Sequence, residues 1–283
     1  MRLVTYRHGE RESFGVVLEE GIVDGARALG GRFPDLKSVL ASGGLSELAR
    51  AVQGSTPDVA LSAVQLRPPI PNPDKILCVG LNYVAHREET GREKSEYPAL
   101  FTRFANTQVG HLQPLMRPSA STELDYEAEL AVVIGRRGRR VKREDALSIV
   151  AGYSCYHDAT LRDWQRHTHQ YTPGKNFPAT GGFGPWIVTA DEIPDPSKLT
   201  VVGRLNGKEM QRSATDLLIF DVPALIAYIT TFTELVPGDV LSTGTPGGVG
   251  FKRTPPVWLR AGDVFEVEVD GVGVLRNPVV DER

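Results

Sequence analysis

Acidic side chains recur at every second position near the middle of the chain. Asp125, Glu127 and Glu129 alternate with apolar or aromatic residues, and the segment continues into a β-branched block that ends at Ile134. This pattern predicts a β-strand over residues 125–134 with the three acids on one face. The Cα atoms of Glu127 and Glu129 would lie about 6.6 Å apart, so both carboxylates could bind one hard divalent cation. A half-exposed strand with a charged outer face would carry the same pair, and other residues must decide between the two.

Three further side chains that could do chemistry lie beside predicted strands or in a restricted loop. His86 follows the apolar strand predicted for residues 75–80, and Asp158 ends the strand predicted for residues 153–157. Functional groups are often placed at such strand ends, on connections that a rigid scaffold holds. Lys175 lies in a loop whose Pro and Gly restrict the backbone. The sequence thus marks a histidine, a further acid and a lysine at such positions, and their position alone assigns them no role.

Other candidate sites are weaker. The glycine-rich segment 244–250 lacks the residue order of a phosphate-binding loop, so nucleotide binding is not expected. His167 and His169 have no cysteine or third histidine at a zinc-binding spacing. Glu266 and Glu268 repeat the Glu-x-Glu pattern in a terminal hairpin, where we expect an exposed charged face.

The elements that must position these residues fall into two parts. Short alternating segments in residues 1–30 predict a meander of strands, and apolar residues at helical spacing in residues 35–52 predict a pair of helices that covers it. Prolines between residues 57 and 73 predict an extended connector. We therefore expect a small N-terminal α+β domain over residues 1–70 and a larger domain over residues 71–283.

The larger domain is expected to be rich in strands. Asn206-Gly207 and Asp270-Gly271 are hairpin-turn signals, and residues 221–234 predict a helix with Asp221 as its N-cap. A further helix is predicted near residues 143–150, and the charged segment 87–103 is expected to be a mobile lid or a solvated helix. Helices at irregular intervals, without a repeat or regular βαβ units, indicate an α+β fold.

Composition narrows the class of protein. The chain has 283 residues and a formal net charge of −3, which argues against a general nucleic-acid binder despite the basic segment 136–143, expected to be a solvated turn. Apolar runs are too short to predict a membrane span, and the first residues lack the apolar core of a secretory signal. Cys78 and Cys155 are expected to be buried free thiols. We expect a cytosolic protein without a nucleic-acid or membrane partner.

Several separated motifs together resemble the fumarylacetoacetate hydrolase family over residues 74–280. In chain order they are Val79-Gly80-Leu81-Asn82-Tyr83-x-x-His86, Asp125-Tyr126-Glu127-x-Glu129-Leu130, Asp158-x-x-x-Arg162-Asp163-Trp164-Gln165, Gly174-Lys175-Asn176-Phe177, Gly184-Pro185-Trp186, the Asn206-Gly207 hairpin and Ser242-Thr243-Gly244-Thr245-Pro246-x-Gly248-Val249-Gly250. The resemblance implies a catalytic domain built as a mixed β-sheet roll or sandwich. It also implies a homodimer formed through the larger domain.

The resemblance further implies a divalent cation, Mg²⁺ or Mn²⁺, held by Glu127, Glu129 and Asp158. Oxygen donors alone suit such hard cations on physical grounds as well. The same likeness makes His86 the general base, with Glu89 as its partner one helical turn further on.

Lys175 would be an electrophilic or proton-donating partner in this scheme. The positions expected on the substrate side are Arg162, Gln165 and Thr245. Departures from the family pattern cluster around the expected pocket: His157, Leu161, Pro178 and the run Gly181-Gly182-Phe183. Together the segments 172–177 and 180–186 resemble members that hydrolyse 2,4-diketo-3-deoxy sugar acids.

The leading hypothesis is a metal-dependent hydrolase that cleaves the carbon–carbon bond of a β-diketo acid, an acylpyruvate or a diketo sugar acid. The products would be pyruvate and a second carboxylic acid. The same metal enolate would serve an isomerase or decarboxylase of a 2-oxo or 2-hydroxy-dienoic diacid, or of oxaloacetate, in which no water attacks. The pair of His86 and Glu89 favours hydrolysis. A third class, a protein that binds a small molecule without catalysis, would use the same pocket as a receptor site.

Overall fold

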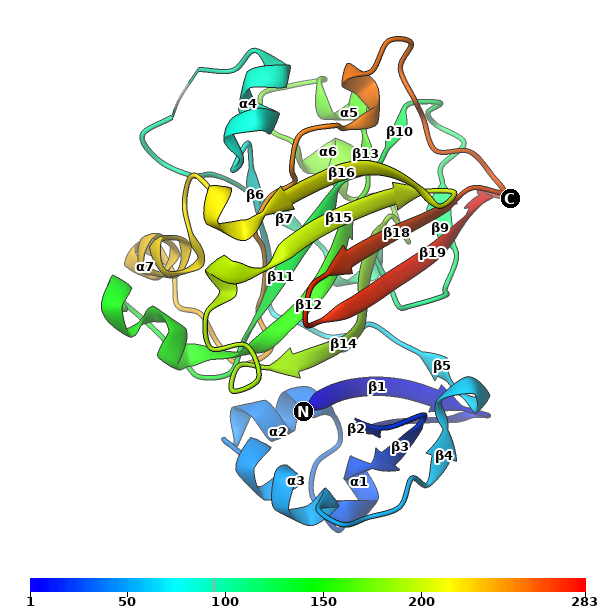
Figure 1. Ribbon diagram of the computed structural model, residues 1–283, viewed down its shortest axis with the longest axis vertical. Helices are drawn as coiled ribbons and strands as arrows, with labels where there is room; N and C mark the ends of the chain where they lie inside the picture. Colours follow the sequence, from blue (N-terminus) through cyan, green and yellow to red (C-terminus); the bar gives the residue numbers. More distant parts are fainter. Residues whose placement is uncertain (94) are drawn as a thin grey trace.

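The computed structural model describes residues 1–93 and 95–283 and has the expected α+β class (Figure 1). A large mixed sheet of twelve strands runs through the molecule. In spatial order it contains β4 (Val59–Ala60), β3 (Gly21–Asp24), β2 (Arg11–Leu18), β1 (Arg2–His8), β14 (Gly181–Thr189), β12 (Val150–Asp158), β11 (Ala128–Ile134), β17 (Val240–Ser242), β6 (Ile76–Gly80) and β7 (Ala99–Arg103), with β5 (Gln65–Leu66) beside β1 and β8 (Gln108–Val109) beside β14.

A second sheet of five strands packs against the middle of the first (Figure 1). Its order is β16 (Lys208–Ala214), β15 (Thr200–Leu205), β18 (Val264–Val269), β19 (Gly273–Asp281) and β9 (Leu115–Arg117), and the separate pair β10 (Leu124–Asp125) and β13 (Thr160–Leu161) lies apart from both. Leu130 and Val132 of β11 share one apolar core with Phe265 and Val267 of β18. The expected hairpin turn at Asn206-Gly207 joins β15 to β16.

Short helices fill the connections. They are α1 (Gly25–Ala28), α2 (Leu36–Ala41), α3 (Leu45–Val52), α4 (Val84–Thr90), α5 (Arg162–Gln165), α6 (Thr172–Lys175) and α7 (Val222–Phe232). Single 3₁₀ turns occur as η1 (Leu61–Ala63), η2 (Ala105–Thr107), η4 (Pro196–Lys198), η5 (Thr215–Leu217) and η6 (Gly250–Lys252), and η3 (Arg143–Ile149) is longer. Asp221 caps α7 as predicted, because its side chain accepts a hydrogen bond from the backbone N–H of Ala224. Within the described residues no helix is long and apolar enough to cross a membrane.

The acidic strand predicted over residues 125–134 is divided in two. Asp125 belongs to β10, and β11 begins only at Ala128. The side chain of Asp125 accepts hydrogen bonds from the backbone N–H groups of Tyr126 at 2.8 Å and Gly250 at 2.7 Å. The N–H of Tyr126, which a continuous strand could use to pair with a neighbouring strand, is therefore bound to a carboxylate instead. Both faces of β11 are buried, which rules out the half-exposed charged face as an explanation of the glutamate pair.

Two other predicted elements differ in detail from the structure. The helix predicted near residues 143–150 is present as the 3₁₀ helix η3, and Val150 already begins β12. The charged segment 87–103 is not one lid, because α4 ends at Thr90 and residues 99–103 form β7, which pairs with β6.

The basic segment 136–143, expected to be a solvated turn, also contacts helix α7. Its side chains are largely exposed, but the guanidinium of Arg139 donates to the carbonyl oxygens of Thr230 and Thr231 at 2.6 and 2.8 Å. These carbonyls lie in the last turn of α7, where a cation offsets unpaired acceptors. The segment therefore holds the end of this helix in place.

The N-terminal part is joined to the rest through the large sheet. Backbone pairing of Arg2 with Val188 and of Leu3 with Ile187 places β1 next to β14. Helices α1 to α3 cover the short strands on one side (Figure 1), and their apolar side chains share a core with the odd-numbered residues Ala131 and Val133 of β11. The division into domains at residue 70 stays a prediction.

Candidate active site

Three carboxylates meet where the central strands β11 and β12 begin and end. These strands are antiparallel, and the backbone N–H of Asp158 donates to the carbonyl oxygen of Glu127 at 3.0 Å. One carboxylate oxygen from each of Glu127, Glu129 and Asp158 lies within 4.8 Å of the others, and all three residues are buried. The structure thus brings together the three acids that the sequence singled out. Their donors are all oxygen, which suits a hard divalent cation.

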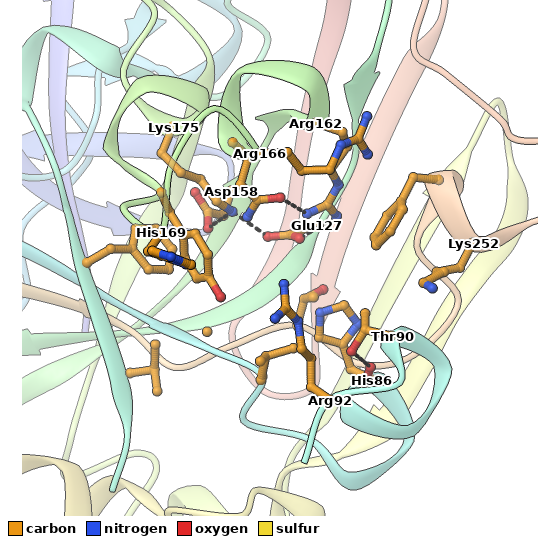
Figure 2. A pocket seen from close by; sticks show the side chains of 18 of the residues that line it. His86, Thr90, Arg92, Glu127, Asp158, Arg162, Arg166, His169, Lys175 and Lys252 are labelled. Carbon is orange, nitrogen blue, oxygen red and sulfur yellow. Dashed lines mark hydrogen bonds and ion pairs between the residues drawn. The ribbon is translucent and has the colours of Figure 1, made fainter. Parts of the chain in front are cut away.

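Buried cations bracket two of these acids (Figure 2). Nζ of Lys175 lies 2.7 Å from Glu127 Oε2 and 2.6 Å from Asp158 Oδ2. Arg162 donates to Glu127 at 2.5 Å, and Arg103 donates to Asp158 at 2.5 Å. Burial alone would raise the pKa of Glu127, but Arg162 and Lys175 outweigh it and hold that pKa well below its usual range.

Glu129 has a different environment. Its Oε2 accepts hydrogen bonds from the hydroxyl of Ser242 at 2.5 Å and the backbone N–H of Gly244 at 2.8 Å. Among the described residues no Lys or Arg forms an ion pair with it. Burial, together with the negative charges of Asp158 and Glu127, raises the pKa of Glu129 well above its ordinary value. This acid is therefore the one that most needs a further positive charge.

The charge balance of the buried cluster leads to the same conclusion. Four buried carboxylates face three buried cations: Asp125, Glu127, Glu129 and Asp158 against Arg103, Arg162 and Lys175. Uncompensated charge is costly away from water, so with all four carboxylates ionised one negative charge remains, which a proton on Glu129 or a bound cation offsets. The residues present fit a divalent cation, with Glu129 as the ligand least committed to other partners.

His86 and Glu89 form a pair on α4. Nδ1 of His86 lies 2.7 Å from Glu89 Oε1, as their spacing of three residues on a helix predicts. The other carboxylate oxygen of Glu89 accepts a hydrogen bond from the backbone N–H of Gly248 at 2.9 Å. His86 is buried and lines the same pocket as the carboxylates. With Nδ1 held by Glu89, the other ring nitrogen, Nε2, is left for the cavity.

A buried asparagine fixes the start of this helix. Asn82 lies between β6 and α4, and its amide donates to the carbonyl oxygens of Phe220 at 2.9 Å and Thr243 at 2.7 Å. Its side-chain oxygen accepts from the backbone N–H of Phe220 at 2.8 Å. Leu81, just before it, has a positive φ of 59°, which turns the chain sharply from the strand into the helix. The asparagine of the first motif is therefore a positioning residue for His86.

The glycine-rich loop 244–250 binds carboxylates of the protein itself. Backbone N–H groups of Gly244, Gly248 and Gly250 donate to Glu129, Glu89 and Asp125 respectively. A Cβ at Gly250 would lie 2.0 Å from the carbonyl oxygen of Val257, so the loop can approach this closely only with glycine there. The loop thus orients three acids around the site.

The positions expected on the substrate side line the same cavity of about 530 Å³ as the acids, His86 and Lys175. Most of the Arg162 guanidinium is already bound within the protein. It donates to Asp125 and Glu127, and its Cζ lies 4.3 Å from the ring centroid of Phe251. Gln165 accepts from Arg162 at 2.9 Å. These positions, Arg162, Gln165 and Thr245, are thus placed as expected, and their roles stay predictions.

Some contributors to the site were not predicted from the sequence. Arg103 is the last residue of β7, and its side chain donates to Asp158 on β12. In the sequence it is marked only as a single positive charge at the end of a short segment that contains apolar residues. Asp125 was recognised as part of the alternation but not as the residue that binds both Arg162 and the glycine-rich loop.

The weaker candidate residues do not belong to the buried carboxylate cluster. His167 and His169 line the cavity, and among the described residues the carboxylate triad is the only group of three or more His, Cys, Asp or Glu side chains close enough together to hold a metal ion. Glu266 and Glu268 lie half-buried on β18, where Glu268 pairs with Arg204.

Comparison with known proteins identifies the family. The chain belongs to the fumarylacetoacetate hydrolase family, because residues 75–280 match the model of the fumarylacetoacetate hydrolase C-terminal domain. The chain is 39% identical to the mitochondrial oxaloacetate tautomerase Fahd2a of Rattus norvegicus, over 99% of this chain and 92% of the relative. It is 38% identical to the mitochondrial oxaloacetate tautomerase FAHD2A of Homo sapiens over the same shares.

Solved structures give the same family with two kinds of activity. Maleylpyruvate hydrolase from Sphingobium sp. SYK-6, in complex with manganese(II) and pyruvate, is 30% identical with a TM-score of 0.84. The 5-carboxymethyl-2-hydroxymuconate delta-isomerase of Mycobacterium smegmatis is 31% identical with a TM-score of 0.79. Each comparison covers 100% of both chains. These relatives support an enzyme of the family acting on keto acids, and they do not establish the predicted hydrolase activity.

The predicted cytosolic location is contradicted by these comparisons. The relatives from Rattus norvegicus, Xenopus laevis and Homo sapiens are named as mitochondrial proteins. The sequence argument considered only an apolar secretory segment, whereas mitochondrial targeting uses amphipathic, arginine-rich segments that such a test does not detect.

Proposed function

We propose that this protein is a divalent-metal-dependent tautomerase that moves a proton between C3 and the 2-oxo oxygen of a 2-oxo acid, with oxaloacetate as the leading substrate. The site observation behind the proposal is the His86 and Glu89 pair, which shares one cavity with the buried triad of carboxylates and could move a proton beside a bound metal in either reaction. The names of the similar proteins from rat, frog and human support the substrate.

The triad fits Mg²⁺ or Mn²⁺, and such an ion would act as a Lewis acid that favours negative charge on the 2-oxo oxygen. His86 would take the proton from C3 through Nε2, because Glu89 holds Nδ1. Lys175 has three N–H donors, of which Glu127 and Asp158 engage two. The third can donate to the oxygen on which charge develops. Transfer of this proton from the imidazolium to the 2-oxo oxygen gives the enol and leaves the protein unchanged, and the reverse steps return it to C3.

Hydrolysis of an acylpyruvate is the second candidate. It is favoured by the similarity to a maleylpyruvate hydrolase that binds manganese(II) and pyruvate. In that reaction His86 would take a proton from water instead of from C3, and the water oxygen would end in the carboxylic acid product. The two candidates therefore differ in whether water enters the product.

One experiment separates them. Protein loaded with Mg²⁺ or Mn²⁺ is mixed with oxaloacetate in D₂O, and proton NMR follows exchange at C3 while ultraviolet absorbance follows the enol. Parallel samples contain an acylpyruvate, with pyruvate release and ¹⁸O uptake from labelled water as readouts. Metal-dependent acceleration of enol loss without pyruvate release supports the tautomerase. Absence of any acceleration with oxaloacetate, together with ¹⁸O in the acid released from the acylpyruvate, would replace it with the hydrolase.

A further inference from the structure

The cavity has a second, outer group of cations that differs from the inner group. Arg103, Arg162 and Lys175 are buried and bound to carboxylates, whereas Arg92 and Lys252 line the same cavity and are exposed. Within the described part of the chain neither Arg92 nor Lys252 forms an ion pair with an acidic side chain. Their charges are therefore available to a ligand.

These two side chains reach the cavity from separate elements. Arg92 follows Gly91, the residue with positive φ that ends α4, and Lys252 lies at the end of η6, with Nζ 5.4 Å from the ring centroid of Phe251. Figure 2 shows the Arg92 side chain directed into the cavity from the α4 side and Lys252 approaching from the loop that follows β17. His86, the proposed base, belongs to the same helix as the turn that carries Arg92.

We propose that Arg92 and Lys252 form a subsite for the second carboxylate of a dicarboxylic 2-oxo acid, and that this subsite selects diacids over monoacids. The inference rests on the proposed function, because it assumes that the 2-oxo acid end lies at the triad. A substrate such as oxaloacetate carries another carboxylate at its opposite end. This carboxylate loses bound water on entering the cavity, which costs free energy unless protein donors replace the water. An arginine fork and a lysine ammonium are suitable donors for a carboxylate.

The size of the cavity favours anchoring of the substrate by such charges. About 530 Å³ is far more space than a four-carbon acid needs, so the walls alone cannot fix its distal end. Anchoring the second carboxylate at Arg92 would hold C3 of the substrate between this subsite and the triad, on the side from which His86 acts. Arg166, another arginine of the lining, is paired with Glu123 and is less available for this task.

The test compares binding of two acids that differ only in the distal carboxylate. Calorimetry with Mn²⁺-loaded protein measures Kd for 2-oxoglutarate and for 2-oxopentanoate, which do not require turnover. The variants are Arg92→Gln, Lys252→Gln and the double variant. The control combines Arg136→Gln and Lys208→Gln, which removes the same charge at exposed positions that do not line the cavity.

The expected result is a preference for the diacid in the unaltered protein that falls at least tenfold in the double variant, while Kd for the monoacid changes less than threefold. The KM for oxaloacetate should rise in parallel. Absence of a preference in the unaltered protein, or an equal fall in the control, would overturn the inference. If the preference falls as expected but the unaltered protein does not accelerate oxaloacetate tautomerisation, the subsite stands and the proposed function fails.

Discussion

The ammonium nitrogen of Lys175 lies 2.6 Å from a carboxylate oxygen of Asp158, so a lysine and the expected cation share a ligand. Lys175 also contacts Glu127 at 2.7 Å and is itself buried. Burial would lower the pKa of Lys175, but Asp158 and Glu127 outweigh it and raise that pKa, which keeps the side chain charged. A positive charge therefore stands beside the triad before any ion binds.

Replacement of Lys175 by methionine should separate metal binding from catalysis. Without the ammonium, Glu127 and Asp158 lose a competing partner, so the variant should bind Mn²⁺ at least as tightly as the unaltered protein. Exchange of substrate C3 hydrogens should fall by about 10²-fold, because a donor to the developing oxyanion is lost. Calorimetry and NMR exchange measure the two effects. A tenfold weaker affinity for Mn²⁺ would show that Lys175 supports the metal site.

Glu129→Gln should remove most of the affinity for Mn²⁺ with little loss of stability. Glu129 lacks an ion-pair partner among the described residues, so the change leaves no buried cation unpaired, unlike loss of Glu127. Calorimetry with Mn²⁺ and a thermal unfolding curve are the measurements. Glu266→Gln, on the half-buried hairpin strand β18, is the matched control and should leave the affinity unchanged. Unchanged affinity in the Glu129 variant would remove it from the ligand set.

Glu89→Gln should slow proton transfer at C3 by about 10- to 100-fold, because the neutral amide stabilises the imidazolium of His86 less well. His86→Asn should remove the metal-dependent exchange altogether. Neither change should alter Mn²⁺ affinity by more than a few fold. Glu88→Gln is the control, since Glu88 is adjacent in sequence but 68% exposed. Exchange at the unaltered rate in both test variants would mean that another group is the base.

The stability of the fold should depend on pH through His111. Burial, with Arg276 nearby, lowers the pKa of His111 to about 4, and its Nδ1 accepts a hydrogen bond from the backbone N–H of Arg276. The unfolded imidazole binds a proton near pH 6.5, so the unfolded state holds more protons between pH 6.5 and 4. The free energy of unfolding should therefore fall as the pH drops through this window, by on the order of 3 kcal/mol from this residue.

Urea unfolding curves at pH 7 and pH 4.5 measure this effect. The comparison is between the unaltered protein and His111→Gln, which retains an acceptor for the Arg276 N–H. The variant should lose less stability between the two pH values than the unaltered protein does. An identical loss in both would assign the pH dependence to other groups.

A homodimer formed through residues 71–283 stays a prediction. Exposed aromatic side chains offer area for such an interface: Tyr97 and Phe232 are 58% and 57% exposed, and both contact Tyr228 of α7. Light scattering at low micromolar concentration should give twice the chain mass. A single-chain mass together with full activity would contradict the prediction.

The sequence was most informative where chemistry and local structure coincide. Alternation marked Glu127 and Glu129, and a helical spacing of three residues placed Glu89 beside His86. Arg103, the second cationic partner of Asp158 beside Lys175, could not be predicted in this way. Arg103 lies 55 positions away in the chain, and only the order of strands in the large sheet brings the two together.

The reaction itself was the least predictable part. His86 can accept a proton from water or from carbon, and both reactions use the same acids and the same lysine. The identity of the residues therefore does not distinguish a hydrolase from a tautomerase, since the outcome depends on whether a water molecule is positioned at the carbonyl carbon. Similarly, the side chains that the glycine-rich loop binds, Glu89, Asp125 and Glu129, lie in distant segments and could not be assigned to the loop from the sequence.

Pairing of β1 with β14 has a consequence for how the chain can be divided. β14 is held along one side by β12, and its other side is shared between β8, at Gly181 and Gly182, and β1, at Ile187 and Val188. Removing the first 70 residues would leave the second half of β14 with unpaired backbone groups on an apolar strand. Such an edge is a template for association between chains. The N-terminal part thus covers this edge, and we expect a chain without it to associate through the exposed half of β14.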